Sequence, residues 1–215
     1  MTPDKIYFKN REVAAYRLID ILPINKMKLE EWTVLSTSYG GYAVAKIIAN
    51  ELNAKFDVMF SRKIYAPLNE ECEVAIVTET EEVVIHEELV KAFDISLDFI
   101  FSRSRYIFEN DLSNCVNKFR RGKRLNNLEN KNVLLIDEGL NTSLTMMACI
   151  KTAINLGAKS VSVAVPILPT ASISTIESIA DDLYFVKSLD HFIDIEFYYD
   201  ELEDITYEEI RKEKG

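Results

Sequence analysis

Cysteine is scarce in this sequence, and basic residues are outnumbered by acidic ones. The three cysteines, Cys72, Cys115 and Cys149, are odd in number and far apart, so they form neither a disulfide framework nor a CxxC metal pair. Twenty-five basic against thirty-five acidic residues give a formal net charge of −10, which repels the backbone of nucleic acids. We therefore expect a cytoplasmic protein that has no nucleic acid partner.

Several functional signatures are also missing. No apolar run approaches the roughly 18 residues of a membrane span, and residues 1–5 lack the apolar core of a signal peptide, so no membrane partner is expected. There is no GxGxxG, and Gly122-Lys123 is followed by Arg124 rather than by Ser or Thr, which excludes the common nucleotide loops. With only His86 and His191, a Ser/His/Asp hydrolase has little to be built from.

Apolar strands alternate with amphipathic helices along the chain. The 215 residues, 48% of them hydrophobic, can bury one large core, and we expect a single domain over 1–215. Strands are predicted at 32–36, 56–60, 74–77, 132–136 and 161–166, and helices at 11–22, 42–52 and 145–156. This order predicts an α/β fold with a parallel sheet covered on both faces. Ligands of such sheets bind at the carboxyl ends of strands, here the loops after Leu35, Val77 and Ile136.

The charged stretch 79–121 has a different pattern. Its apolar residues follow mixed helical spacing, and few residues typical of hairpin turns lie between them. This pattern predicts helices with mobile connections rather than strands. We expect 79–124 to form a lid or helical insert over the site.

The segment 133–146 (VLLIDEGLNTSLTM) carries the clearest chemistry. Asp137 and Glu138 end a buried strand, and Thr142, Ser143 and Thr145 open a helix whose free N–H groups favour an anion such as a phosphate. Carboxylates beside a phosphate must face groups that donate hydrogen bonds, as sugar hydroxyls do. A phosphorylated sugar would satisfy both the anion-binding helix start and the two carboxylates. The alternative is a solvated turn with Thr142 as an ordinary N-cap.

This segment resembles the signature of the type I phosphoribosyltransferases, which is an apolar strand, two acids and a phosphate loop. Further blocks are similar to one subgroup of that family: FKNRE at 8–12, SYGGYAVA at 38–45, RKI at 62–64 with Pro67, Asn69 and Glu71, FRRGKR at 119–124, and FYYD and TYEEI near the end. In FRRGKR a structural role is as plausible as a catalytic one. The resemblance runs from about residue 8 to residue 210 and implies the family's fold, with 187–215 as a C-terminal hood segment.

The resemblance implies a transfer of 5-phosphoribosyl from 5-phosphoribosyl 1-diphosphate to a nitrogenous acceptor such as a nucleobase. Mg²⁺ would be the cofactor, held chiefly by substrate oxygens and water rather than by protein ligands. Asp137 and Glu138 would hold the ribose hydroxyls as the catalytic pair. The other implied substrate-binding residues are Tyr39, Gly40, Gly41, Arg62 and Lys63 for the diphosphate, and Gly139, Leu140, Asn141, Thr142, Ser143, Leu144 and Thr145 for the 5-phosphate.

Four of these positions depart from the family pattern, and Asn141 and Leu144 among them replace small residues. Ser143 stands where the phosphate loop has Gly, so its Cβ could forbid a positive φ, and Tyr39 replaces an Arg of the subgroup. An active transferase and a non-catalytic sensor of 5-phosphoribosyl 1-diphosphate or a nucleotide therefore both remain open. The acceptor base and the oligomeric state, a homodimer included, also remain open.

Overall fold

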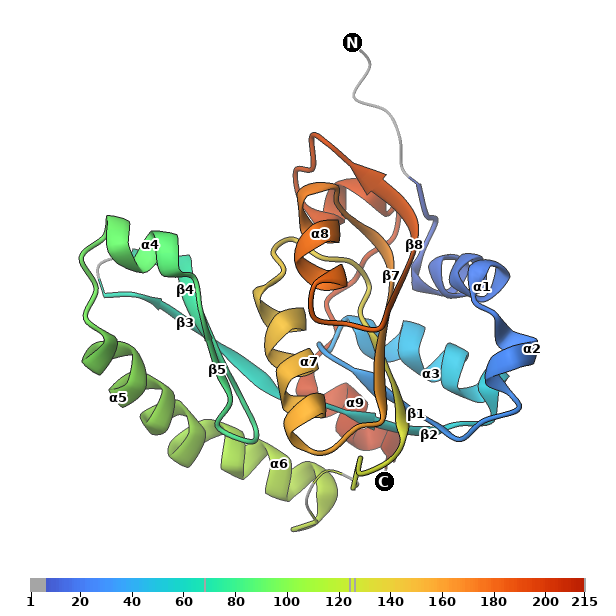
Figure 1. Cartoon of the computed structure of the whole chain (residues 1–215), viewed down its shortest axis with the longest axis horizontal. Helices are drawn as coiled ribbons and strands as arrows, with labels where there is room; N and C mark the ends of the chain where they lie inside the picture. Colours follow the sequence, from blue (N-terminus) through green and yellow to red (C-terminus); the bar gives the residue numbers. More distant parts are fainter. Residues whose placement is uncertain (1–6, 68, 124, 126, 215) are drawn as a thin grey trace.

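The computed structural model describes residues 7–67, 69–123, 125 and 127–214. The predicted features at 1–5 and at Arg124 lie outside these residues. At the centre is a parallel sheet of order β2-β1-β6-β7-β8 (Figure 1). Its strands are β1 (Trp32–Ser36), β2 (Lys55–Val58), β6 (Asn132–Ile136), β7 (Ser160–Pro169) and β8 (Asp182–Leu189). The strand order reverses between β1 and β6, and this is where doubly wound sheets bind ligands.

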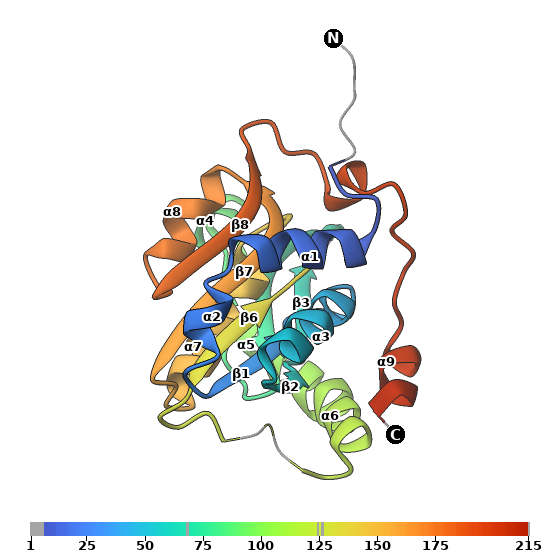
Figure 2. The same cartoon turned by 90° about the vertical axis from the view of Figure 1, so that its right-hand side faces the viewer.

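Helices cover both faces of this sheet, as the sequence predicts. On one side lie α1 (Arg11–Ile21) and α3 (Gly41–Leu52), and on the other α7 (Leu144–Asn155) and α8 (Ala171–Glu177) (Figure 2). In β6, Leu134 and Ile136 pack toward α3, while Val133 and Leu135 pack toward α7. Burial on both faces explains why this strand is a continuous apolar run. Gly157, with φ of 81°, follows the end of α7 as expected of a helix-terminating glycine.

A second, antiparallel sheet extends away from the first (Figure 1). It consists of β3 (Ser61–Ala66), β4 (Asn69–Thr78) and β5 (Val83–Ile85). The predicted strand at 74–77 belongs to this sheet, so the expectation that the loop after Val77 lies at the site is wrong. That loop lies beside the later turns of α7, where the Thr78 and Thr152 hydroxyl oxygens are 2.9 Å apart.

The stretch 79–121 is mainly helical but begins with a strand. The prediction of no strand there is wrong, because β5 pairs with β4 through a turn in which Glu81 takes a φ of 63° without being glycine. The helices that follow are α4 (Glu87–Ala92), α5 (Leu97–Ile107), the π-helix η1 (Phe108–Leu112) and α6 (Ser113–Arg120). They bury Ile100, Leu112 and Phe119 against the second sheet, which forms a separate core.

The C-terminal segment returns along the whole molecule. It contains the short η2 (Ile195–Tyr198) and the helix α9 (Tyr207–Lys214), and a short helix α2 (Ile24–Met27) precedes β1. Tyr199 forms a parallel bridge with Phe8, and the Asp200 N–H donates to the Phe8 carbonyl over 3.0 Å. The start of the described chain and the segment around Tyr199 are therefore paired beside α1. In the described part of the chain, no helix is long and apolar enough to cross a membrane.

Candidate active site

A cavity of about 340 Å³ lies at the carboxyl ends of β1 and β2. It brings together residues from three separate blocks of the sequence. Of the predicted site residues, Tyr39, Arg62, Lys63 and Thr145 line it, together with Thr37 and Ser38. A larger cavity of about 480 Å³ lies at the opposite edge of the sheet, between Lys28 and Lys131, and contains no predicted site residue.

Asp137 joins the end of β6 to the loop after β1. It is 7% exposed, and its carboxylate accepts hydrogen bonds from Thr37 Oγ1 over 2.7 Å and from Ser38 Oγ over 2.5 Å. The Glu138 N–H donates to the same carboxylate over 2.8 Å. Burial raises the pKa of Asp137, and these hydrogen bonds oppose the rise. In this conformation Asp137 holds the loop after β1 in place.

Glu138 is held by residues from both ends of the chain. Its Oε2 lies 2.5 Å from Arg11 Nε, and its backbone carbonyl accepts from the Tyr199 hydroxyl over 2.6 Å. Burial, followed by the charge of Asp137, raises the pKa of Glu138 to about 7, although Arg11 acts in the opposite direction. Arg11 is recognisable in the sequence only as part of the FKNRE block, and no local pattern places it at the site, since the pair is 127 positions apart.

Gly40 and Gly41 are required because the loop after β1 packs closely against Asp137 and Glu138, and not because it needs unusual φ values. Gly40 has a φ of −62°, and neither glycine is among the residues with positive φ. A Cβ at Gly41 would lie 2.8 Å from the Cα of Asp137, and a Cβ at Gly40 would overlap the Glu138 carboxylate. The steric demand comes from the acids that pack against this loop, which leave no room for a Cβ.

The predicted phosphate loop opens α7 without a side-chain cap. Ser143 is the N-cap with a φ of −81°, so a positive φ is not needed there, and Thr142 is exposed rather than the N-cap. Because no side chain caps this helix start, its first N–H groups are free of side-chain acceptors, as an anion site requires. Thr145 reaches the cavity from the first turn.

The other loop residues have structural contacts in this conformation. Leu140 and Leu144 are buried, and Gly139 packs tightly against Ile167 and Ile195. The Asn141 amide donates to Asp194 over 2.7 Å and its Oδ1 accepts from the Ile195 N–H over 2.9 Å. The side chains of Leu140, Asn141 and Leu144 are thus engaged within the protein, and the predicted roles of these four residues would rest on their backbone groups.

The two predicted cations line the cavity but already have partners. Arg62 Nε lies 2.6 Å from Asp111, and its guanidinium lies 5.9 Å from the centre of the Tyr39 ring. Lys63 Nζ lies 2.9 Å from Glu73. A diphosphate would have to compete with these carboxylates for both cations.

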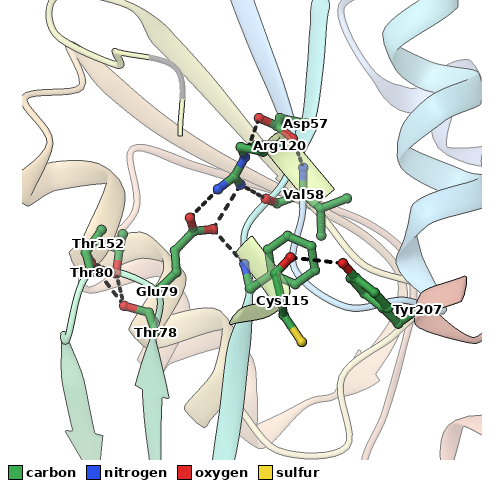
Figure 3. Close-up of polar contacts among 10 residues, drawn as sticks. Asp57, Val58, Thr78, Glu79, Thr80, Cys115, Arg120, Thr152 and Tyr207 are labelled. Carbon is green, nitrogen blue, oxygen red and sulfur yellow. Dashed lines mark hydrogen bonds and ion pairs between the residues drawn. The ribbon is translucent and has the colours of Figure 1, made fainter. Parts of the chain in front are cut away.

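The basic FRRGKR block has a structural role at Arg120. Its side chain is 3% exposed and lies 2.9 Å from Asp57 at the end of β2 (Figure 3). It also donates to the Val58 carbonyl and to Glu79, whose other contact is the Phe60 N–H at 2.9 Å. Arg120 thus ties α6 to both sheets and is not among the residues that line the cavity.

Comparisons with known proteins agree with this architecture. The family model described as phosphoribosyl transferase domain matches residues 10–201. Two curated Mycobacterium tuberculosis proteins, named "Putative phosphoribosyl transferase" MT0597 and Rv0571c, are each 28% identical over 152 residues. The match covers 70% of this chain and 34% of each relative, so the chain spans about a third of the length of these relatives.

Solved structures show the same fold at low sequence identity. The protein TT1426 from Thermus thermophilus has a TM-score of 0.76 and 22% identity, and the match covers 95% of this chain and 96% of that one. Purine phosphoribosyltransferase from Pyrococcus horikoshii Ot3 has a TM-score of 0.51 and 14% identity, with coverage of 92% and 94%. Because the family model matches most of the chain, this chain belongs to the phosphoribosyl transferase domain family.

Proposed function

We propose that this protein transfers 5-phosphoribosyl from 5-phosphoribosyl 1-diphosphate to a nitrogenous acceptor, with a nucleobase as the expected class. The supporting observation is the arrangement at the strand-order reversal. The uncapped start of α7, at Thr145, and the Thr37–Ser38–Tyr39 loop border one cavity. Asp137 is hydrogen-bonded to that loop, and the Glu138 carboxylate packs against Gly40, which follows it. One ligand with a phosphate at one end, a diphosphate at the other and a sugar between them would use all three features.

The chain's contribution to such a reaction is positioning and charge stabilisation. The α7 N–H groups and Thr145 would bind the 5-phosphate, while the loop after β1 and Lys63 would bind the diphosphate. An acid that accepts from ribose hydroxyls would orient the sugar and stabilise positive charge at C1 as the diphosphate leaves.

Mg²⁺ is proposed as an ion that arrives with the substrate. Among the described residues, no group of three or more His, Cys, Asp or Glu side chains gathers to hold a metal. Asp137 already accepts three hydrogen bonds, so diphosphate oxygens and water are the ligands that suit this hard cation here. When bound, the ion would neutralise charge on the leaving diphosphate.

A sensor that binds the same ligand without transfer is the second candidate. The observation in its favour is that Arg62 and Lys63 are both paired with carboxylates, and that Tyr39 supplies no cation. Such a site has less positive charge for a leaving diphosphate than the family pattern implies.

The test is pyrophosphate release from 5-phosphoribosyl 1-diphosphate with Mg²⁺ and a panel of purine and pyrimidine bases, alongside calorimetric binding. Base-dependent release would support the transferase, and binding without release would support the sensor. Lys63→Met should weaken pyrophosphate binding several-fold, whereas Lys55→Met, at the opposite edge of the sheet, should not. Absence of binding in the unaltered protein would overturn both candidates.

A further inference from the structure

Glu138 has one carboxylate oxygen fixed and one left for a ligand. Arg11 Nε holds Oε2 over 2.5 Å, while Oε1 lies against the backbone of Gly40. Among the described residues, none donates a hydrogen bond to Oε1. The Arg11 and Glu138 side chains are 13% and 16% exposed, so the pair is mostly shielded from water but still reachable.

Arg11 is itself anchored from a third segment. Its Nη1 donates to the Glu203 carbonyl over 2.7 Å, and the Glu138 carbonyl accepts from Tyr199, which is 5% exposed. Helix α1, the loop after β6 and the C-terminal segment therefore meet at this one side chain. Such anchoring removes rotamer freedom from Glu138 before any ligand arrives.

We propose that Arg11 is a positioning residue, which holds Glu138 so that its Oε1 accepts hydrogen bonds from the ribose hydroxyls of the ligand. The proposal rests on the function proposed above. It also divides the roles of the two acids. Asp137 is engaged with Thr37, Ser38 and the Glu138 N–H, so Glu138 is the acid with an oxygen to offer.

The charges around Glu138 give this role a second consequence. The groups that face it are Asp137 from its own loop, Arg11 from α1, and Tyr199 and Asp204 from the C-terminal segment. Arg11 is the only cation among these four, and it opposes the burial and the Asp137 charge that raise the Glu138 pKa. Without Arg11 the pKa rises further, Glu138 is protonated at neutral pH, and its oxygen becomes a weaker acceptor.

The experiment compares Arg11→Gln, Arg11→Lys and the control Arg17→Gln in the full chain. Arg17 lies on the same helix and contacts the Phe8 ring, 5.5 Å from its guanidinium carbon, and has no contact with Glu138. Calorimetry would measure the binding of ribose 5-phosphate and, separately, of pyrophosphate over a range from about pH 6 to about pH 9.

We expect Arg11→Gln to weaken ribose 5-phosphate binding several-fold at neutral pH and to recover toward alkaline pH. Pyrophosphate binding should be unchanged, and Arg11→Lys should lie between Arg11→Gln and the unaltered protein. An unchanged affinity and pH profile for ribose 5-phosphate would overturn the inference, as would an equal loss for pyrophosphate, which marks a general structural defect.

If Arg11→Gln does not fold, the test becomes the pKa of Glu138 in Arg11→Lys, measured by NMR. We expect this pKa to be higher than in the unaltered protein, and an unchanged pKa would count against the inference. If the unaltered protein binds neither ligand, the proposed function itself fails.

Discussion

At the scale of single residues, Asp137 and Glu138 show how two neighbouring acids acquire different surroundings. Both end the same strand, but their carboxylates point to different partners, Thr37 and Ser38 in one case and Arg11 in the other. Burial raises the pKa of both groups. The protonation state of this loop should therefore affect stability as well as binding.

The raised pKa of Glu138 predicts that stability decreases as the pH rises. Between the usual value of 4.5 and the folded value of about 7, the folded state keeps a proton that the unfolded state has released. The free energy of unfolding should therefore fall with pH across this window and level off above it. Glu138→Gln should reduce this slope, with Asp137 contributing the remainder in the same direction.

Urea unfolding at a series of pH values would measure the slope. Glu177→Gln, an exposed change at the end of α8, is the matched control. A slope that Glu138→Gln leaves unchanged would show that this carboxyl does not titrate in the window.

Ser143 provides a second test at this scale. Its φ of −81° is accessible to any residue, so a glycine there would add no conformation that the loop needs. Ser143→Gly should therefore not tighten the binding of ribose 5-phosphate. If the hydroxyl donates to the phosphate, binding should weaken by about 0.5–1.5 kcal/mol, while stability changes by only a few tenths of a kcal/mol.

Calorimetry with ribose 5-phosphate separates the outcomes for Ser143. Tighter binding would contradict the structural reading of this loop. An unchanged affinity would mean that position 143 does not touch the ligand, and the phosphate site would have to be placed elsewhere.

At the scale of elements, a cluster of buried polar contacts links the two sheets beside their apolar packing. Arg120 on α6 contacts Asp57 at the end of β2 and Glu79 after β4, with all three side chains 3% exposed (Figure 3). The aromatic rings of Phe60, Phe119 and Tyr207 pack beside this cluster, so α9 takes part in the same junction. The position of the cavity between the sheets depends on this junction.

Removal of the Arg120 side chain should lower the free energy of unfolding substantially. Arg120→Met would remove the guanidinium that contacts two buried carboxylates, and breaking a buried ion pair in this way typically destabilises a protein by about 3–5 kcal/mol. Arg120→Lys should recover only part of this loss, because an ammonium cannot reproduce the contacts of the planar guanidinium. Urea unfolding would measure the effect, with the exposed Lys118→Met on the same helix as control. A loss no greater than that of the control would contradict the junction's importance.

At the scale of the whole molecule, the helical layer and second sheet form an arm beside the parallel sheet (Figure 1). Of the described residues between 79 and 123, none lines the cavity, so a lid role for 79–124 stays a prediction about movement. Large apolar side chains are exposed on this layer, including Phe93, Leu97 and Phe101, each more than half exposed. The association of two chains into a homodimer also stays a prediction.

The lid prediction is tested by hydrogen exchange. Amides of α4 and α5 should exchange faster than those of β6, because these helices pack on one side only and leave apolar residues in water. If 79–105 closes over a ligand, 5-phosphoribosyl 1-diphosphate should slow exchange there. Equal protection of α4, α5 and β6 without ligand would identify a fixed structural insert.

The sequence by itself determined the parts of this protein that depend on local pattern. The strands at 32–36 and 132–136 and the helix at 42–52 are found at or within one residue of the predicted bounds, because apolar runs and helical spacing are properties of neighbouring residues. The family and the helix at 145–156 could likewise be predicted from contiguous patterns. The short β5 could not, since its turn uses Glu81 at positive φ without a glycine signal.

Only the tertiary structure decided which of these pieces meet. The strand at 74–77 was predicted as a strand, but its sheet and direction depend on β3 and β5, which are not evident from its own pattern. The pairing of Arg11 with Glu138 and of Arg120 with Asp57 joins residues 127 and 63 positions apart. Sequence spacing carries no information on such contacts, because they form only when the packing of the core brings distant segments together and excludes water from the charges between them.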